Sequence, residues 1–318
     1  MKKIRMISVI LVLLVLMSAC SSKGGSGVKE YTLATGGTTG TYFSFGTTIA
    51  SLWDKRVPNT HTTVVSTGAS KENLRMISSG EADFAIVQND ILWYALNGSE
   101  LFAGEKLSGI SAVCSMYKEY VQIVVPASSE IKSIADLSGK RVSVGASGSG
   151  TEANARQILA ASDLAYDDIT VKYQSFSDSV SGLKNGTVDA AFVTAGAPNA
   201  AVEQLTAQLK LRILSIDTAV MQKLIAEYPF YTIGSVPASA YGLDADVQTL
   251  AISAVLVCRS GLSDDETYAF TAGIYDNLAE LGAANAKGLE MSIGGALSGL
   301  FDPIHGGAKK YYSEKGVS

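Results

Sequence analysis

Apolar and polar residues in the first third of the chain follow two alternating patterns. Short apolar stretches at 30–37, 62–67 and 82–88 predict β-strands. Between them, residues 42–56 and 71–80 carry apolar side chains at helical spacing. The order strand, helix, strand, helix, strand with short connections predicts a parallel sheet covered by helices. Ligands of such sheets bind at the carboxyl ends of the strands.

A second unit of the same kind follows. Its pattern predicts strands at 120–126, 140–145, 169–174 and 188–194, and helices at 131–139, 151–163 and 177–186. A long apolar stretch at 249–259 then predicts a strand that returns the chain to the first unit, and helices follow to the end.

Two such units predict an α/β fold of two lobes that face one cleft, each a mostly parallel sheet with flanking helices. Lobe I would comprise residues 29–121 plus 256–318, and lobe II residues 122–255. If the strand at 249–259 lies beside the strand at 120–126, these two strands form a hinge between the lobes.

Composition excludes several classes of function. The net charge is −5 with 17% charged residues and no basic patch, so nucleic acid is not expected as a partner. Cys114 and Cys258 each lie in an apolar stretch, where a buried thiol is the commoner role, although a disulfide between them stays open. His61 and His305 lie far apart and no Cys/His spacing of the zinc type occurs, so we expect no metal site.

The N-terminus has the features of a secretory signal. A basic start, "MKKIR", precedes an apolar run of about a dozen residues, which is short for a bilayer span of about 20. Residues 16–20, "LMSAC", resemble a bacterial lipobox, which predicts lipidation of Cys20 after removal of the signal. Residues 21–28 then read as a flexible tether. We therefore expect an extracytoplasmic protein held on a bacterial membrane by its lipid; plain secretion with a cleaved signal is the alternative.

One glycine-rich stretch resembles a dinucleotide-binding turn. Gly148 and Gly150 stand between a predicted strand and a predicted helix. However, Gln174, Ser175 and Phe176 stand where the acidic residue that holds the ribose should be. We therefore expect no nucleotide cofactor. Either an anion site or a simple helix cap at this stretch remains open.

An extracellular hydrolase is the opposing class of function. The order Gly145-Ala146-Ser147-Gly148-Ser149 fails the G-x-S-x-G pattern at its last position, and two isolated histidines offer little choice of base. We therefore expect a binding protein and not an enzyme.

Six blocks resemble, in order, the TAXI family of substrate-binding proteins, which are extracytoplasmic receptors of tripartite TRAP transporters. They extend over nearly the whole chain after the signal, with two small departures, "HGG" at 305–307 in place of His-Pro-Gly, and Phe43-Ser44 in place of an aromatic residue and a proline. The blocks are "TGGTTGTYFSFG" (35–46), "STGASKENLRMISSGEADFAIVQND" (66–90), "IKSIADLSGKRVSVGASGSGTE" (131–152), "LKNGTVDAAFVTAGAPNAAVEQL" (183–205), "VPASAYG" (236–242) and "IHGGAKKYYSEKG" (304–316).

The resemblance implies a periplasmic-binding-protein type II-like fold that closes over a small acid. It implies a monomer that delivers glutamate, glutamine or a dicarboxylate such as 2-oxoglutarate to a TRAP-type membrane permease, without a cofactor. No arginine of the six blocks is placed to clamp a carboxylate, so helix N-termini would have to bind it. A receptor of an ABC importer or of a sensor kinase would have the same fold and stays as the alternative.

Candidate ligand-binding residues follow from strand ends and helix starts. Several have a structural alternative: Thr39 and Ser70 as helix caps, Asp90 as the cap of a helix at 91–96, and Tyr42 as a core-edge aromatic. A ligand role is favoured for Gln88 at a strand end. The complete set is Thr39, Gly40, Tyr42, Ser70, Gln88, Asp90, Ser149, Gly150, Thr151, Pro198 and Asn199.

Overall fold

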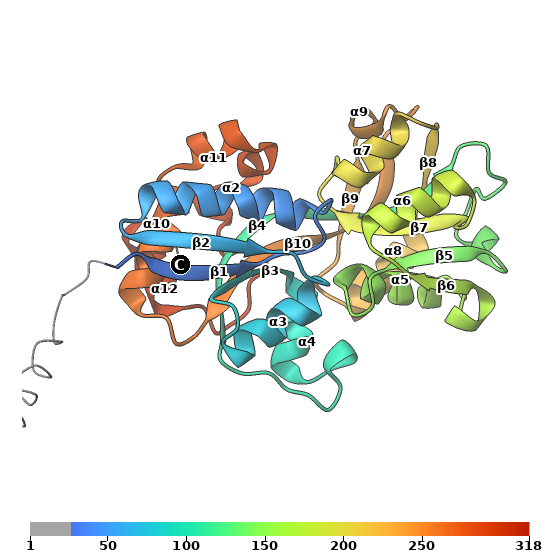
Figure 1. Cartoon of the computed structure of the whole chain (residues 1–318). Coiled ribbons are helices and arrows are strands. Elements are labelled where there is room, and N and C mark those ends of the chain that lie inside the picture. Colours follow the sequence, from blue (N-terminus) through green and yellow to red (C-terminus); the bar gives the residue numbers. More distant parts are fainter. Residues whose placement is uncertain (1–26, 318) are drawn as a thin grey trace, which may run out of the picture.

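A computed structural model describes residues 27–317. The predicted signal segment, the lipidation site Cys20 and most of the tether lie outside the described residues. Figure 1 shows two masses of helices and strands side by side, connected by the long strands β4 and β10. The predicted two-lobed α/β fold is confirmed. We use lobe I and lobe II for the two sets of residues proposed above.

One ten-stranded sheet runs through both lobes. Along its main path the order is β2-β1-β3-β10-β4-β7-β5-β6, while β8 pairs with β4 and β9 pairs with β10. The strands are β1 (Lys29–Ala34), β2 (Thr60–Val65), β3 (Phe84–Gln88), β4 (Ile110–Pro126), β5 (Arg141–Gly145), β6 (Thr170–Tyr173), β7 (Ala190–Ala195), β8 (Leu211–Leu214), β9 (Thr232–Val236) and β10 (Val247–Arg259).

Strands β4 and β10 belong to both lobes. In lobe I, β10 pairs with β3 through 254–258; in lobe II it pairs with β9 through 247–251. Strand β4 pairs with β10 through 110–120 and with β7 through 120–124. Both strands run antiparallel to these neighbours, whereas β1, β2 and β3 pair in parallel, as do β5, β6 and β7. The sheet is therefore mixed, and the predicted two-strand hinge is present.

Helices cover both faces of the sheet (Figure 1). In lobe I, α2 inserts Phe45 and Trp53 into a buried aromatic cluster with Phe84 and Phe270. The helices are α2 (Thr41–Arg56), α3 (Ser70–Ser79), α4 (Asn89–Asn97), α5 (Gly150–Ala161), α6 (Phe176–Asn185), α7 (Ala200–Thr206), α8 (Thr218–Glu227), α9 (Ala238–Tyr241), α10 (Asp264–Tyr275), α11 (Leu278–Ala284) and α12 (Gly306–Glu314).

The elements from α7 to α9 were not predicted, and two predicted elements differ from the structure. The helix predicted at 131–139 is only a 3-10 turn, Ala135–Leu137, because the Asp136 side chain accepts hydrogen bonds from the backbone N–H groups of Lys132 and Ser133 and closes a local turn. The strand predicted at 120–126 begins ten residues earlier, at Ile110, since it also forms part of lobe I.

Candidate functional site

A cavity lies between the two lobes, at the carboxyl ends of β1, β3, β5, β6 and β7. The centres of water molecules can occupy about 90 Å³ of it, whereas one water needs about 10–15 Å³ by this measure, so the space suits a small solute. Its lining comprises Gly36, Gly37, Thr39, Gly40, Thr41, Tyr42, Thr67, Gly68, Ala69, Ser70, Gln88, Glu119, Ala146, Ser149, Gly150, Thr151, Gln174, Ser175, Phe176, Thr194 and Ala195.

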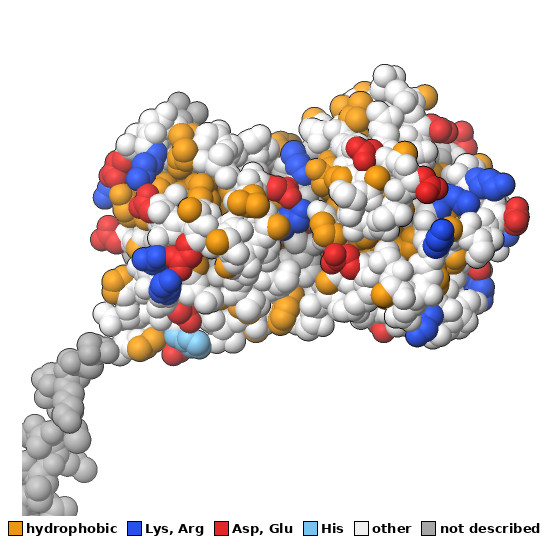
Figure 2. Space-filling view, turned by 90° about the horizontal axis from the view of Figure 1, so that it is seen from above, with side chains coloured by type: hydrophobic (Ala, Val, Ile, Leu, Met, Phe, Trp, Pro, Cys, Tyr) orange, Lys and Arg blue, Asp and Glu red, His pale blue; other side chains and the backbone are white. Residues whose placement is uncertain are grey.

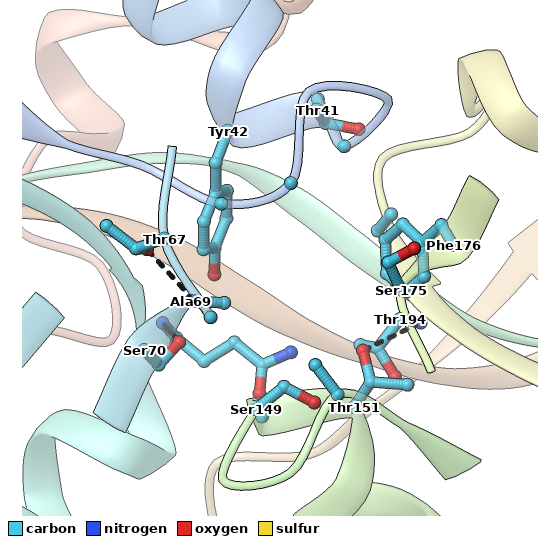
Figure 3. A pocket seen from close by; sticks show the side chains of 18 of the residues that line it. Thr41, Tyr42, Thr67, Ala69, Ser70, Ser149, Thr151, Ser175, Phe176 and Thr194 are labelled. Atoms are coloured by element: carbon cyan, nitrogen blue, oxygen red, sulfur yellow. Dashed lines mark hydrogen bonds between the residues drawn. The ribbon is translucent and has the colours of Figure 1, made fainter. Parts of the chain in front are cut away.

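Four helices begin at this cavity, two from each lobe: α2 and α3 from lobe I, and α5 and α6 from lobe II. Ser149 and Ser175 cap α5 and α6 through their side chains, whereas α2 and α3 have no side-chain cap. Figure 3 shows residues of these helix starts around one central space. Since each helix N-terminus carries about half a positive charge, the arrangement favours a negatively charged ligand group.

A buried carboxyl group forms part of the wall. The Tyr42 hydroxyl, which points into the cavity in Figure 3, donates a hydrogen bond to Glu119 Oε2 at 2.7 Å. Burial raises the pKa of Glu119 to about 8, even though this bond favours the ionised form. Glu119 is therefore mostly neutral near pH 7 in the structure, and a cationic ligand group would favour its ionisation.

Polar atoms without a hydrogen-bond partner also line the cavity. Within the described residues, Gln88 Oε1, Gln174 Oε1 and Thr194 Oγ1 are buried and unpaired. Buried polar groups usually have partners, so these atoms indicate a ligand or ordered water that supplies hydrogen-bond donors. The cavity thus combines helix N-termini, suited to an anion, with acceptors suited to N–H or O–H groups.

The backbone beside the cavity is strained at Ala69. Its φ of 75° and ψ of −147° lie in a region that glycine adopts readily and other residues avoid. The residue precedes α3, and its N–H donates to Thr67 Oγ1 at 3.0 Å, a bond drawn in Figure 3. Such strain costs about 1–3 kcal/mol and is concentrated at functional sites in proteins.

The structure brings eight of the eleven candidate residues together around this cavity. Besides lining it, the Ser70 hydroxyl accepts from the backbone N–H of Gln88, and the Thr151 hydroxyl accepts from the backbone N–H of Thr194. The eight residues are Thr39, Gly40, Tyr42, Ser70, Gln88, Ser149, Gly150 and Thr151.

The structure places Asp90, Pro198 and Asn199 outside the cavity lining. Asn199 Oδ1 accepts from the first N–H groups of α7, so it is a helix cap, and its Nδ2 donates across the lobes to the backbone oxygen of Thr39. Pro198 follows a cis peptide bond in the same loop. Asp90 lies in the first turn of α4, buried against lobe II, with Oδ1 accepting from the N–H of Ile91.

Sequence reasoning missed several lining residues. Gln174, Ser175 and Phe176, which argue against a nucleotide site, lie at the carboxyl end of β6 beside the cavity. Their position after a strand of the second unit was an available signal. For Glu119 the signal was weak, because it follows Lys118 before the strand predicted at 120–126, and only the folded structure places it beside Tyr42.

Other predicted features have plain structural roles. Cys114 and Cys258 are buried free thiols, so the disulfide alternative is wrong in this structure. His305 caps α12, and His61 contacts Asp54 on the surface. Residues 27–317 contain no cluster of three metal-ligating side chains. Within that range no helix combines the length and apolar character needed to span a membrane.

Comparison with known proteins agrees with this two-lobed architecture. A protein from Bordetella bronchiseptica RB50 matches with a TM-score of 0.57 and 14% identity, covering 92% of this chain and 99% of that one. A putative L-cystine ABC transporter from Listeria monocytogenes matches at 0.53 and 15%, covering 83% and 97%. A binding protein component of an ABC phosphonate transporter from Pseudomonas aeruginosa matches at 0.52 and 13%, covering 83% and 80%. At these identities the likeness concerns the fold.

A match to a protein family covers almost the whole described structure. The model of the NMT1-like family matches residues 33–316, from β1 to the end of α12, and so includes both lobes and every residue of the cavity lining. This chain therefore belongs to the NMT1-like family.

Proposed function

We propose that the protein is an extracytoplasmic receptor that closes its two lobes over a small carboxylate-bearing solute and delivers it to a membrane importer. The observation that carries this proposal is the interlobe cavity at which four helices begin. In this arrangement N–H groups from both lobes can bind one carboxylate, so the ligand itself would hold the lobes together. The lining needs no arginine for this purpose.

Among the expected ligands, an amino acid such as glutamate or glutamine fits the cavity better than a dicarboxylate. Glu119 and the unpaired oxygens of Gln88 and Gln174 are acceptors, and an ammonium group supplies three donors. A second carboxylate at the same place would have to share the proton of Glu119. The chemistry of the wall therefore favours a zwitterion.

Two kinds of importer could receive the solute. Two of the structurally similar proteins are named as parts of ABC transporters, which favours delivery to an ABC importer. The six sequence blocks resemble TAXI receptors, which implies a TRAP permease. Uptake of the bound solute by cells separates the two routes, because ABC uptake stops when ATP is depleted, whereas TRAP uptake stops when the ion gradient is collapsed.

Anchoring by a lipid on Cys20 is part of the proposal. The lipid would hold the receptor near its permease, with residues 21–28 as a tether. The Cys20→Ala protein should remain unprocessed or appear in the soluble fraction, while the unchanged protein is found with membranes. Unaltered processing and membrane fractionation of the variant would contradict lipidation at this residue.

Isothermal titration calorimetry tests the binding function directly. The purified protein is titrated with L-glutamate, L-glutamine and 2-oxoglutarate. Binding of an amino acid, together with a smaller radius of gyration in X-ray scattering at saturation, is the expected result. If none of these acids binds and thermal unfolding is unaffected by a wider panel of carboxylates, the proposed ligand class is wrong.

A further inference from the structure

A second set of polar side chains connects the two lobes outside the ligand cavity. Asp90 and Tyr94 extend from α4 of lobe I, and Asn154 and Gln157 extend from α5 of lobe II. Tyr231, which follows α8 in lobe II, contacts both Asn154 and Gln157. We call these five residues the α4–α5 cluster.

The cluster is a chain of hydrogen bonds. Asn154 Nδ2 donates to Asp90 Oδ2 at 3.1 Å and lies 2.8 Å from the Tyr231 hydroxyl. That hydroxyl donates to Gln157 Oε1 at 2.6 Å, and Gln157 Nε2 donates to the Tyr94 hydroxyl at 3.0 Å. Two of these bonds, Asp90 to Asn154 and Gln157 to Tyr94, cross from one lobe to the other.

All five side chains are buried, with Asp90 only 1% exposed. This burial exists because α4 and α5 are in contact. If the lobes separate about β4 and β10, the two helices part and the cluster meets water. Closing the receptor therefore transfers the Asp90 carboxyl group from water into the protein interior.

The surroundings of Asp90 do not compensate an ionised carboxylate. Its oxygens accept from the N–H of Ile91 and from the Asn154 amide, both neutral groups. The titratable groups that interact with it are the hydroxyls of Tyr94 and Tyr231 and the carboxyl group of Glu119 from β4. Within residues 27–317, no lysine or arginine is among the groups that shift the pKa of Asp90.

The basic residue of β4 forms a hydrogen bond away from Asp90. Lys118, next to Glu119, donates to Ser253 Oγ on β10 at 2.9 Å. Burial has the largest effect on the Asp90 carboxyl group and raises its pKa to about 7, although its hydrogen bonds favour the ionised form. In the open receptor, with the carboxyl group in water, the ordinary value of about 3.9 applies.

We propose that Asp90 is a positioning residue that takes up a proton when the lobes close, so that the α4–α5 cluster holds the closed receptor more firmly in acidic than in alkaline solution. The idea rests on the proposed function only in that a receptor opens and closes. Between about pH 4 and 7 the closed form binds more protons than the open form, so closure weakens by up to tenfold per pH unit as the pH rises. Above about pH 7 this dependence ends.

A disulfide lock gives a test that needs no ligand. A Cβ atom built on Gly148 of lobe II lies 3.7 Å from Lys71 Cβ of lobe I, which is within the range of about 3.5–4.5 Å for a disulfide. The pair of substitutions Lys71→Cys and Gly148→Cys should therefore hold the lobes closed after oxidation, at the cost of backbone strain at residue 148, where φ is 75°. Asp90 is then titrated by ¹³C NMR of the aspartate carboxyl carbons, with Asp90→Asn to assign its signal.

In the locked protein we expect Asp90 to titrate about three pH units above an ordinary aspartate. Titration at the ordinary value would overturn the proposal. This measurement stands even if no acid in the binding screen is a ligand, so the two proposals can fail separately.

Binding of L-glutamate as the probe supplies a second test, should Lys71→Cys and Gly148→Cys prevent folding. Between pH 5 and 7 the affinity of the protein that retains Asp90 should fall more steeply with pH than that of Asp90→Asn. The ratio of the two affinities should change by up to tenfold per pH unit. Both proteins carry Glu119→Gln in addition, because the charge of Asp90 also affects the pKa of Glu119. Asp217→Asn, an exposed aspartate of lobe II, should keep the steep profile. Equal slopes for the protein that retains Asp90 and for Asp90→Asn would refute a proton at this residue.

Discussion

Gly150 is a position at which the two lobes approach each other closely inside the cavity. A Cβ atom added there would lie 1.8 Å from Gln88 Oε1 and 2.3 Å from Gln88 Cδ. Real Cβ contacts do not occur under 3.0 Å. Because Gly150 belongs to lobe II and Gln88 to lobe I, the conflict exists only when the lobes are closed. Gly150→Ala should therefore weaken ligand binding without unfolding either lobe.

The size of the effect follows from the packing of Gln88, which is 2% exposed. One extra methyl group in a well-packed interior costs about 1–3 kcal/mol. Applied to the closed form alone, this weakens affinity by roughly 5- to 140-fold. Calorimetric titration measures the affinity, and thermal unfolding of the ligand-free variant checks that the lobes remain stable.

A double-mutant cycle attributes the loss to Gln88. In the Gln88→Ala background the obstacle is gone, so adding Gly150→Ala should change affinity by little more than about twofold. Gly294→Ala is the matched control, because a Cβ there meets no atom within 4 Å. If Gly150→Ala binds as tightly as the Gly294→Ala control, the reasoning about interlobe contact is refuted.

Three further predictions concern residues around the cavity and the interlobe contact. Replacing Ser149 and Thr151 by Ala together should weaken binding by at least about a hundredfold, because two hydrogen bonds to a charged group of about 1.5–3 kcal/mol each are lost; full calorimetric affinity in a less stable variant would reduce them to structural groups. Glu119→Gln should stabilise the ligand-free protein more at pH 8 than at pH 5. The reason is the raised pKa of Glu119, because of which the unchanged protein loses stability as the pH rises from about 4.3 towards 8. An equal gain in melting temperature at both pH values would contradict this. The ring centroids of Trp93 and of Phe230 in lobe II lie 6.0 Å apart. Closure of the lobes on a ligand should therefore change the fluorescence of Trp93. That response should vanish in Trp93→Phe, since the other tryptophan, Trp53, lies buried within lobe I.

The surface of the protein carries charges of both signs. On the face shown in Figure 2, acidic and basic side chains are scattered over both lobes without a large patch of one sign. This agrees with the modest net charge of −5. This face therefore offers no strong long-range attraction for an ion of either sign.

The sequence alone determined the parts of the fold that depend on local pattern. Alternating apolar strands and amphipathic helices predicted two α/β units, and strand ends and helix starts predicted eight of the 21 residues that line the cavity. Thr39, Tyr42, Gln88 and Thr151 were found in this way, because parallel strands bring their carboxyl ends to the same edge of a sheet.

Only the tertiary structure decided the contacts between distant segments. Glu119 meets Tyr42 within lobe I, and Asp90 meets Asn154 across the two lobes, between residues that are 77 and 64 positions apart. An acidic residue at a helix start can be a helix cap, a ligand-binding group or an interlobe contact. The local sequence around Asp90 is compatible with each of these roles. The packing of α4 on α5 separates these roles, because burial is a property of the folded lobes together and not of any one segment.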